Sequence, residues 1–222
     1  MSLIVKICGL STPETLDAAL DARADMVGFV FFPPSPRHLE FDMARSLGRQ
    51  VRNRAQKVAL TVDADAAFLQ SVIEALRPDI LQLHGAESVA QIQTVQRMFG
   101  LPVMKALPIA IRADLERISH YAAVVDRLLF DARAPRDATR PGGLGNTFDW
   151  HLLEAVQPGV PFMLSGGLDA DNVGEALRIT RATGIDVSSG VERELGVKDS
   201  DKITAFVRAA RAAVGDRAHP VA

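Results

Sequence analysis

The sequence has few of the features that mark a secreted, membrane-bound or nucleic-acid-binding protein. It has one cysteine in 222 residues, which cannot form an intrachain disulfide, and it starts without a basic segment followed by a long apolar one. The most apolar stretch, Met26 to Phe32, is far shorter than the roughly 20 residues that span a bilayer. The net charge is −2, and no cluster of Lys and Arg is dense enough to indicate a nucleic acid or a membrane surface. We therefore expect a cytoplasmic protein whose partner is a small molecule.

Motifs for metals and nucleotides are also missing. The five histidines stand singly, without the spacing of a metal site. They are His38, His84, His120, His151 and His219. No Walker-type loop occurs, and the third glycine of a dinucleotide motif is absent after Gly143-Leu144-Gly145. The sequence therefore implies no metal.

Short β-branched runs alternate with longer amphipathic segments along the chain. Each run has the length of a buried parallel strand. The eight expected strands cover residues 4–7, 27–31, 57–62, 80–83, 103–107, 128–130, 161–164 and 184–187. Apolar residues make up 48% of the chain and charged residues 23%, which is typical of a globular protein with one sizeable core.

Segments with helical spacing lie between these strands. The first helix is expected to begin at Thr12-Pro13, the fourth to follow the capping residue Ser88, and the last to run from about Ser200 to Val214. The other helices are expected at about 42–52, 68–76 and 112–121, from about 148, and after 169. Eight units in this chain give about 28 residues per unit, the size of one strand and one helix in a βα barrel.

The predicted fold is an α/β fold, a single-domain eightfold βα barrel. We expect the barrel to occupy residues 1–214 and residues 215–222 to form a disordered tail. A doubly wound open sheet is the alternative, since periodicity does not distinguish a closed sheet from an open one. The absence of a dinucleotide motif after the first strand disfavours that alternative.

Polar side chains follow several of the expected strands. The carboxyl ends of barrel strands meet at one mouth, where the reactive groups of this fold gather. The polar residues at these ends are Cys8, Arg37, Asp63, His84, Asp131, Ser188 and Ser189. A cysteine and an aspartate across such a mouth could accept and donate a proton in an isomerisation next to a carbonyl or imine. Cys8 and Asp131 are therefore the candidate catalytic pair.

Each member of this pair has a structural alternative. A free cysteine is commonly a small buried apolar residue, and an aspartate after a strand can cap a loop. A catalytic Cys8 has to lose its proton at least transiently, which positive charge from Lys6 would favour. Alternation along the strand places Lys6 on the same side as Cys8, and a buried ammonium group needs an anionic partner.

Two clusters of small residues suggest an anion site. Ser165-Gly166-Gly167 follows the seventh strand and Ser188-Ser189-Gly190 follows the eighth, each before a helical segment. Backbone amides in such loops hold phosphate in this fold without a basic side chain. Ordinary tight turns are the alternative, but clusters after both strands favour a phosphate site.

Two further segments are candidates for contacts with a substrate. Residues 133–146 form a long connection rich in Arg, Pro and Gly, which we expect to act as a lid. Arg37 follows the stiff segment Pro33-Pro34-Ser35-Pro36, which favours a fixed position over a free surface charge. Its planar guanidinium group suits a substrate carboxylate.

With these residues placed, the chain resembles the phosphoribosylanthranilate isomerase family of βα-barrel enzymes in tryptophan biosynthesis. The resemblance covers essentially Val5 to Arg211 and consists of seven blocks in the order of the family. The blocks are KICG, VGFVFFPPSPR, QLHG, LLFDA, GGLGNTFDW, SGGL and DVSSGVE. No block is specific by itself, but seven in register are.

The resemblance implies an Amadori rearrangement without a cofactor. The ring of a ribosylamine phosphate opens to a Schiff base, the neighbouring sugar carbon loses a proton, and an aminodeoxyribulose phosphate results. By resemblance, Cys8 is the general base that removes this proton, and Asp131 is the general acid that protonates the ring oxygen. The substrate would be a small phosphorylated aromatic-amine sugar, and we expect a monomer, with a homodimer as the alternative.

The resemblance also assigns residues that bind the substrate. Arg37 would hold the anthranilate carboxylate, and His84 would line the pocket without an assigned role. The residues expected to bind the phosphate, the lid contacts and the remaining sugar atoms are Gly166, Gly167, Ser189, Gly190, Gly143, Gly145 and Asp186. One departure concerns the lid, because the family usually carries a lysine where this chain has Asn146 and often a small hydroxyl residue where it has Leu144.

Two other functions are compatible with the residues alone. A different sugar-phosphate isomerase, epimerase or lyase could use the same phosphate loops, because such sites recur across barrels. An epimerase would be expected to show metal-binding His and Asp residues, and an indole-forming synthase an acid and lysine set, neither of which we find in the sequence. The third hypothesis is a non-catalytic barrel that binds a phosphorylated metabolite and uses Cys8 only as a core residue.

Overall fold

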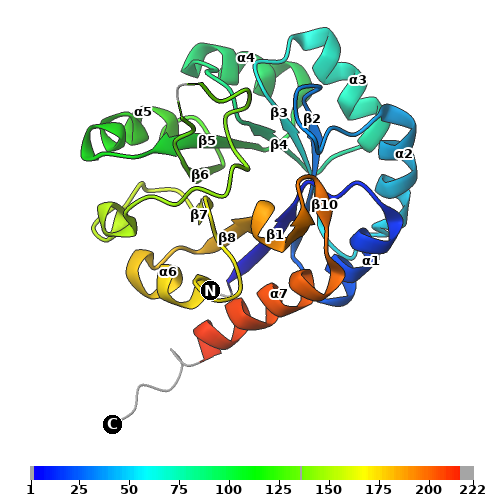
Figure 1. Cartoon of the computed structure of the whole chain (residues 1–222). Helices are drawn as coiled ribbons and strands as arrows, with labels where there is room; N and C mark the ends of the chain where they lie inside the picture. Colours follow the sequence, from blue (N-terminus) through cyan, green and yellow to red (C-terminus); the bar gives the residue numbers. More distant parts are fainter. Residues whose placement is uncertain (1–2, 136, 216–222) are drawn as a thin grey trace.

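The computed structural model describes residues 3–135 and 137–215, and its central feature is a closed barrel of eight parallel strands (Figure 1). The strands are β1 (Ile4–Cys8), β2 (Met26–Phe31), β3 (Gln56–Thr61), β4 (Ile80–Leu83), β5 (Val103–Ile109), β6 (Arg127–Ala132), β7 (Phe162–Leu164) and β8 (Gly184–Val187). They follow one another in chain order around the ring, and β1 pairs with β8 from Ile4 opposite Gly184 to Ile7 opposite Val187. The predicted eightfold barrel is therefore confirmed, and the open sheet is excluded because the first and last strands are joined.

The helices cover the outside of the barrel. They are α1 (Pro13–Asp21), α2 (Phe41–Gln50), α3 (Ala66–Leu76), α4 (Val89–Phe99), α5 (Ile118–Ala122), α6 (Val173–Thr180) and α7 (Ser200–Gly215). The expected caps are present: Thr12 accepts from the Thr15 amide, and Ser88 forms a capping box with Gln91. α7 packs against both α6 and α1, so the ring of helices closes where the ring of strands does (Figure 1).

Two expected helices form partly or wholly as 3₁₀ helix. The fifth begins as a 3₁₀ helix, η1 (Arg112–Arg117), before α5. The sixth starts where it is expected but forms only one 3₁₀ turn, η2 (Trp150–Leu153). Pro158, Gly159 and Pro161 follow soon after, and these residues do not continue a helix.

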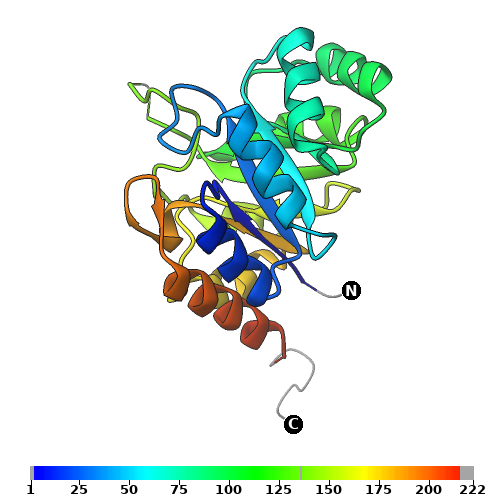
Figure 2. The ribbon, with the colours of Figure 1, turned by 90° about the vertical axis from the view of Figure 1, so that its right-hand side faces the viewer.

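A small antiparallel hairpin follows β8 and was not predicted. After the short 3₁₀ helix η3 (Ser189–Val191), β9 (Glu192–Glu194) pairs with β10 (Val197–Lys198). Gly196 in its turn has a φ of 82°, and a β-carbon there would come within 2.8 Å of the Pro36 carbonyl oxygen. The hairpin therefore packs closely on the loop after β2. Figure 2 shows the hairpin (orange) and that loop (blue) at the same end of the barrel.

The barrel interior is apolar at its centre and polar toward the carboxyl ends of the strands. The central cluster consists of Met26, Val58, Ile80, Met104, Ala106, Leu129 and Met163, one or two residues from each of six strands. Lys6 and Asp186 lie opposite each other on β1 and β8 and are buried. This change from an apolar to a polar interior places the chemistry at one end of the barrel.

Aspartates at the opposite end tie neighbouring strands together. Asp25 accepts a hydrogen bond from the Val5 amide at 2.7 Å, just before β2 begins. Asp79 accepts from the Lys57 amide at 2.7 Å, and Asp126 accepts from the Val103 amide at 2.8 Å. Each bond pairs the start of one strand with the residue preceding the next strand. The first three odd-numbered strands are therefore anchored in the same manner.

The ends of the described chain add two observations. Within residues 3–135 and 137–215, no helix is long and apolar enough to cross a membrane. The tail expected at 215–222 begins with Gly215, which ends α7, and its remaining residues lie outside the described part of the chain.

Replacement of Asp25 by alanine tests the strand anchor. Asp25 also accepts from Arg211 at 2.7 Å, so Asp25→Ala removes two bonds and leaves the Val5 amide without its partner. We expect the free energy of unfolding in urea to fall by about 1–3 kcal/mol with an unchanged m value. The control is Asp21→Ala, whose partner Arg54 is exposed, and we expect a change within about 0.5 kcal/mol. An equal fall in the free energy of unfolding in the two variants would contradict the role of Asp25 as a strand anchor.

Candidate active site

One cleft at the carboxyl ends of the strands collects nearly all of the expected site residues. Its lining includes the candidate catalytic and binding residues Cys8, Arg37, His84, Asp131, Gly143, Gly145, Gly166, Gly167, Asp186 and Ser189. Gly190 is the exception, since it does not line the cleft. A β-carbon at Gly190 would lie 1.9 Å from the Leu168 carbonyl oxygen, so this glycine lets two loops pack closely.

Cys8 ends β1 and lies at the apolar side of the cleft. Its side chain is 3% exposed and packs with Val30 and Leu60. Gly28 of β2 lies opposite, and a β-carbon there would come within 2.9 Å of the Cys8 sulfur. The glycine therefore makes room for the thiol. Burial raises the pKa of the Cys8 thiol above its ordinary value, against the lowering effect of the positive charge on Lys6.

Lys6 precedes Cys8 by two residues on β1 and has the anionic partner that its burial requires. The Lys6 Nζ donates to Asp186 Oδ1 at 2.9 Å, and neither side chain is more than 6% exposed. Burial lowers the pKa of the Lys6 ammonium group, but the charges of Asp186 and Cys8 outweigh this and the pKa is raised. The sequence-based expectation of an anionic partner is confirmed.

Asp131 lies in β6 and contacts His84, which follows β4. The distance from His84 Nε2 to Asp131 Oδ2 is 3.2 Å, and Asp131 Oδ1 accepts from the Ala132 amide at 2.9 Å. The segment after β6 covers this pair, because a β-carbon at Gly142 would come within 2.5 Å of Asp131 Oδ2. His84, which had no assigned role in the sequence, therefore contacts the candidate acid directly.

Arg37 is held by a carboxylate from the unpredicted hairpin. Its Nε donates to Glu192 Oε1 at 2.6 Å and its Nη2 to Glu192 Oε2 at 2.8 Å, a bidentate pair in which both side chains are buried. The Arg37 Nη2 also donates to the Gly143 carbonyl oxygen at 3.1 Å. These contacts fix the guanidinium plane at the edge of the cleft.

Lys198 is the third member of this charged cluster. Its Nζ donates to Glu192 Oε1 at 2.7 Å and to the Ser188 carbonyl oxygen at 2.8 Å. Burial lowers the pKa of the Lys198 ammonium group to about 8 despite the Glu192 charge. Burial raises the pKa of the Glu192 carboxyl, but hydrogen bonds and charge from Arg37 and Lys198 outweigh it and hold that pKa below its usual range.

The two glycine-containing loops lie side by side at the mouth. Gly166 and Gly167 have φ angles of 92° and 62°, in the left-handed region that favours glycine. A β-carbon at Gly166 would lie 2.6 Å from the Ala132 amide nitrogen, so the loop runs close to the end of β6. Asn172 holds the loop by donating to the Gly167 carbonyl oxygen at 2.8 Å. Such half-buried glycine backbone at the mouth of the cleft is suited to contact an anion.

Known proteins match this chain in sequence over nearly its whole length. The family model for N-(5'phosphoribosyl)anthranilate (PRA) isomerase matches residues 5–209. A protein of Bradyrhizobium sp. (strain ORS 278) named N-(5'-phosphoribosyl)anthranilate isomerase is 68% identical over 213 residues, which are 96% of this chain and 97% of the relative. The chain belongs to the N-(5'-phosphoribosyl)anthranilate isomerase family. The resemblance inferred from the seven blocks is thus confirmed.

Solved structures of phosphoribosylanthranilate isomerases have the same fold. The crystal structure of the enzyme from Thermotoga maritima has a TM-score of 0.86 and 32% identity, and the match covers 95% of this chain and 99% of that chain. A second crystal structure, in complex with reduced 1-(o-carboxyphenylamino)-1-deoxyribulose 5-phosphate, has a TM-score of 0.83 and 29% identity over the same shares.

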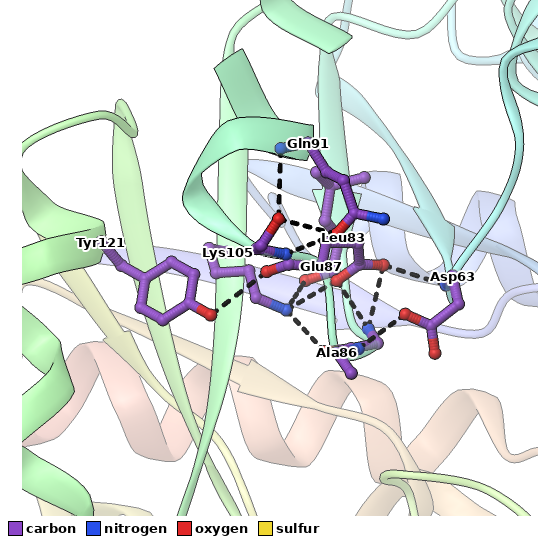
Figure 3. Close-up of polar contacts among 9 residues, drawn as sticks. Asp63, Leu83, Ala86, Glu87, Gln91, Lys105 and Tyr121 are labelled. Carbon is purple, nitrogen blue, oxygen red and sulfur yellow. Dashed lines mark hydrogen bonds and ion pairs between the residues drawn. The ribbon is translucent and has the colours of Figure 1, made fainter. Parts of the chain in front are cut away.

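One residue expected at the mouth of this isomerase barrel does not line the cleft. Asp63 follows β3 with a φ of 46°, and its carboxylate accepts from the Ala86 amide at 2.7 Å. Its own amide donates to Glu87 Oε1 at 3.0 Å. The expectation that Asp63 joins the other strand-end residues at the mouth is therefore wrong, because Asp63 instead links the loops after β3 and β4 (Figure 3).

Glu87 and Lys105 complete this link and were not singled out in the sequence. The Lys105 Nζ donates to Glu87 Oε2 at 2.7 Å and to the Gly85 carbonyl oxygen at 2.7 Å, while the Tyr121 hydroxyl donates to the Glu87 carbonyl oxygen at 3.2 Å (Figure 3). The loop held by these contacts begins at His84. The network therefore supports the histidine that contacts Asp131.

The segment expected to form a lid lines the cleft with its second half. Arg140, Pro141, Gly142 and the stretch 143–146 face the site, so the two departures from the family pattern, Leu144 and Asn146, both lie at its edge. Arg133 at the start of the segment pairs with Asp114. Among the described residues, no group of three or more His, Cys, Asp and Glu side chains is placed to hold a metal ion.

Replacement of Glu192 tests the cluster that holds Arg37. Glu192→Gln leaves two buried cations, Arg37 and Lys198, without their carboxylate, and breaking a buried ion pair in this way costs about 3–5 kcal/mol. We expect a corresponding fall in the free energy of unfolding, measured by thermal and denaturant unfolding. Glu194→Gln, at an exposed position of the same strand, is the matched control and should change stability by no more than about 0.5 kcal/mol.

Proposed function

We propose that this chain catalyses the Amadori rearrangement of N-(5'-phosphoribosyl)anthranilate to 1-(o-carboxyphenylamino)-1-deoxyribulose 5-phosphate, a step of tryptophan biosynthesis. The observation that carries the proposal is that Cys8 of β1 and Asp131 of β6 line one cleft together with two glycine-containing loops. Family membership adds independent support. Cys8 acts as the general base and Asp131 as the general acid.

The reaction begins with the opening of the ribose ring. Asp131 gives a proton to the ring oxygen while the nitrogen lone pair forms a C=N bond with the anomeric carbon and the C–O bond of the ring breaks. The contact with His84 Nε2 orients the Asp131 carboxyl group toward the cleft. The product of this step is a protonated Schiff base.

Cys8 then removes the proton of the neighbouring sugar carbon. The electrons of that C–H bond form a C=C bond, and the C=N electrons return to nitrogen, which gives an enolamine. The enol hydroxyl loses its proton and the anomeric carbon gains one, so the ketone forms. The reaction is an isomerisation, so substrate and product have the same atoms and electrons and no external oxidant or reductant is needed.

Substrate binding divides the cleft into three parts. The anthranilate carboxylate meets the Arg37 guanidinium, which Glu192 and the Gly143 carbonyl oxygen hold in one plane. The aromatic ring lies against the apolar wall of Val30, Phe32, Leu60 and Val62 beside Cys8. The phosphate meets the backbone of the loops at 165–167 and 188–189, with Gly143 and Gly145 closing over the site. Asp186, whose Oδ1 accepts from Lys6, also lines the cleft, and its carboxylate contacts the sugar.

The biological setting is inferred from the same residues. A thiolate base requires a reduced cysteine, which favours the cytoplasm. We infer that residues 1–214 work as one catalytic domain, because the strand ring and the helix ring both close within them. Among residues 3–135 and 137–215, the large exposed apolar side chains Met43, Met98, Ile111 and Leu195 come from four separate segments, which favours a monomer. Light scattering would detect the alternative homodimer.

Substitution of the two catalytic residues tests the mechanism. A general acid or base contributes about 10²- to 10⁴-fold in rate, so Cys8→Ala and Asp131→Asn should each lower kcat by that factor with little change in KM. The assay is the loss of phosphoribosylanthranilate fluorescence with purified protein. Met98→Ala, a substitution at an exposed position of α4, controls for differences in protein preparation. Unchanged turnover in both variants would refute the assigned roles, and no turnover by the folded wild-type protein would refute the activity.

The pH dependence of the reaction tests Cys8 separately. The active form is the thiolate, and burial raises the pKa of the thiol, so kcat/KM should rise with pH through the alkaline range up to that pKa. In Cys8→Ser the residual activity should lack this rise, because a serine hydroxyl does not ionise there. The pH profile of the serine variant relative to wild type is the measurement, and an identical alkaline rise in both would assign it to another group.

A further inference from the structure

A buried ammonium group lies directly beneath the candidate base and is not part of the acid–base pair. We propose that Lys6, kept charged and in place by Asp186, is a positioning residue that stabilises the thiolate form of Cys8. The proposal rests on the proposed function of Cys8 as general base. It assigns Lys6 a role in generating the base, without direct contact to the substrate.

The geometry around Gly28 brings the two side chains together. Lys6 and Cys8 are two residues apart on β1, so both side chains point into the barrel. A β-carbon on Gly28 would lie 2.9 Å from the Cys8 sulfur and 3.0 Å from the Lys6 Nζ. Both atoms therefore border the space that the missing side chain of Gly28 leaves open. They are at most about 6 Å apart, within the range where an opposite charge shifts the pKa of a neighbouring group.

Asp186 explains why the ammonium group remains charged in this position. Lys6 is fully buried, and an isolated buried ammonium group would release its proton instead of remaining charged. The pairing of β1 with β8 sets Lys6 opposite Asp186, and their side chains meet at 2.9 Å. The carboxylate thereby fixes both the charge of Lys6 and its distance from the sulfur.

The other charged groups around Cys8 are placed to have smaller effects. β2 presents Gly28 and the apolar Val30 to Cys8, Asp186 of β8 opposes ionisation of the thiol, and Lys198 of β10 favours it. Lys198 is bound by Glu192 and Ser188, and Arg37 is bound by Glu192. Lys6 has the largest effect among the charges that lower the pKa of the Cys8 thiol, which burial alone would raise further.

The barrel contains a second buried lysine that serves as a matched control. Lys105 of β5 is also nearly buried and also pairs with a carboxylate, Glu87, at 2.7 Å. It is bound to the loop after β4 (Figure 3) and is not among the largest influences on the pKa of the Cys8 thiol. If Lys6 had only a structural role, replacing Lys6 and replacing Lys105 would have the same effect on every measurement of the Cys8 thiol.

The test titrates the thiol directly in the substrate-free protein. Cys8 is the only cysteine, so thiolate absorbance and the rate of alkylation with iodoacetamide both report on this residue alone, with Cys8→Ala as the blank. Lys6→Gln keeps a donor for Asp186 but removes the charge. We expect the pKa of Cys8 to rise by about 1–3 units, and the alkaline rise of kcat/KM to move by the same amount with little change in KM. Lys105→Gln should leave the pKa of Cys8 unchanged.

An unchanged pKa of Cys8 in folded Lys6→Gln would overturn the proposal, as would an equal shift in Lys105→Gln. If Lys6→Gln does not fold, the double variant Lys6→Met with Asp186→Asn removes the whole ion pair and leaves no lone buried charge. The double variant lacks the ammonium group that lies next to the sulfur, so the thiol pKa should still lie above the wild-type value, and a value at or below it would refute the role. The titration needs no substrate, so its failure is distinct from unchanged turnover in Cys8→Ala.

Discussion

The pairing of β1 with β8 is the contact on which the rest of the site depends. It closes the barrel, and it also sets Lys6 opposite Asp186, two residues that are 180 positions apart in the chain. Without this pairing, a charged lysine two residues before the candidate base would have no partner inside an apolar barrel. The closure of the fold and the electrostatic surroundings of Cys8 are therefore consequences of the same hydrogen-bonded register.

Side chains from separate elements hold the reactive groups at the mouth. His84 contacts Asp131, Glu192 grips Arg37 with both oxygens, and the Glu87–Lys105 pair supports the loop that begins at His84. A buried ion pair contributes little net stability, because the loss of hydration offsets much of the attraction. What these pairs provide is a defined geometry, which acid–base chemistry and recognition of a planar carboxylate both require.

The sequence predicted the barrel well because its signals are local. Short apolar runs, several of them β-branched, marked all eight strands, and Thr12 and Ser88 marked two helix starts by capping. The hairpin at 192–198 was missed because its strands are only three and two residues long and have no alternating pattern. Glu192 was therefore seen only as the last residue of a sequence block, although it binds Arg37 across 155 positions. Asp63 was misplaced for a related reason, since its partner loop after β4 could not be identified from position alone.

The sequence by itself determined the order of strands and helices, the candidate acid and base, and the family, because periodicity, caps and seven blocks in register are properties of neighbouring residues. Only the tertiary structure decided which side chains support them: Asp186 for Lys6, His84 for Asp131, and Glu192 with Lys198 for Arg37. These contacts join residues far apart in the chain, and burial determines their charge states. Both distance and burial exist only once the barrel has closed.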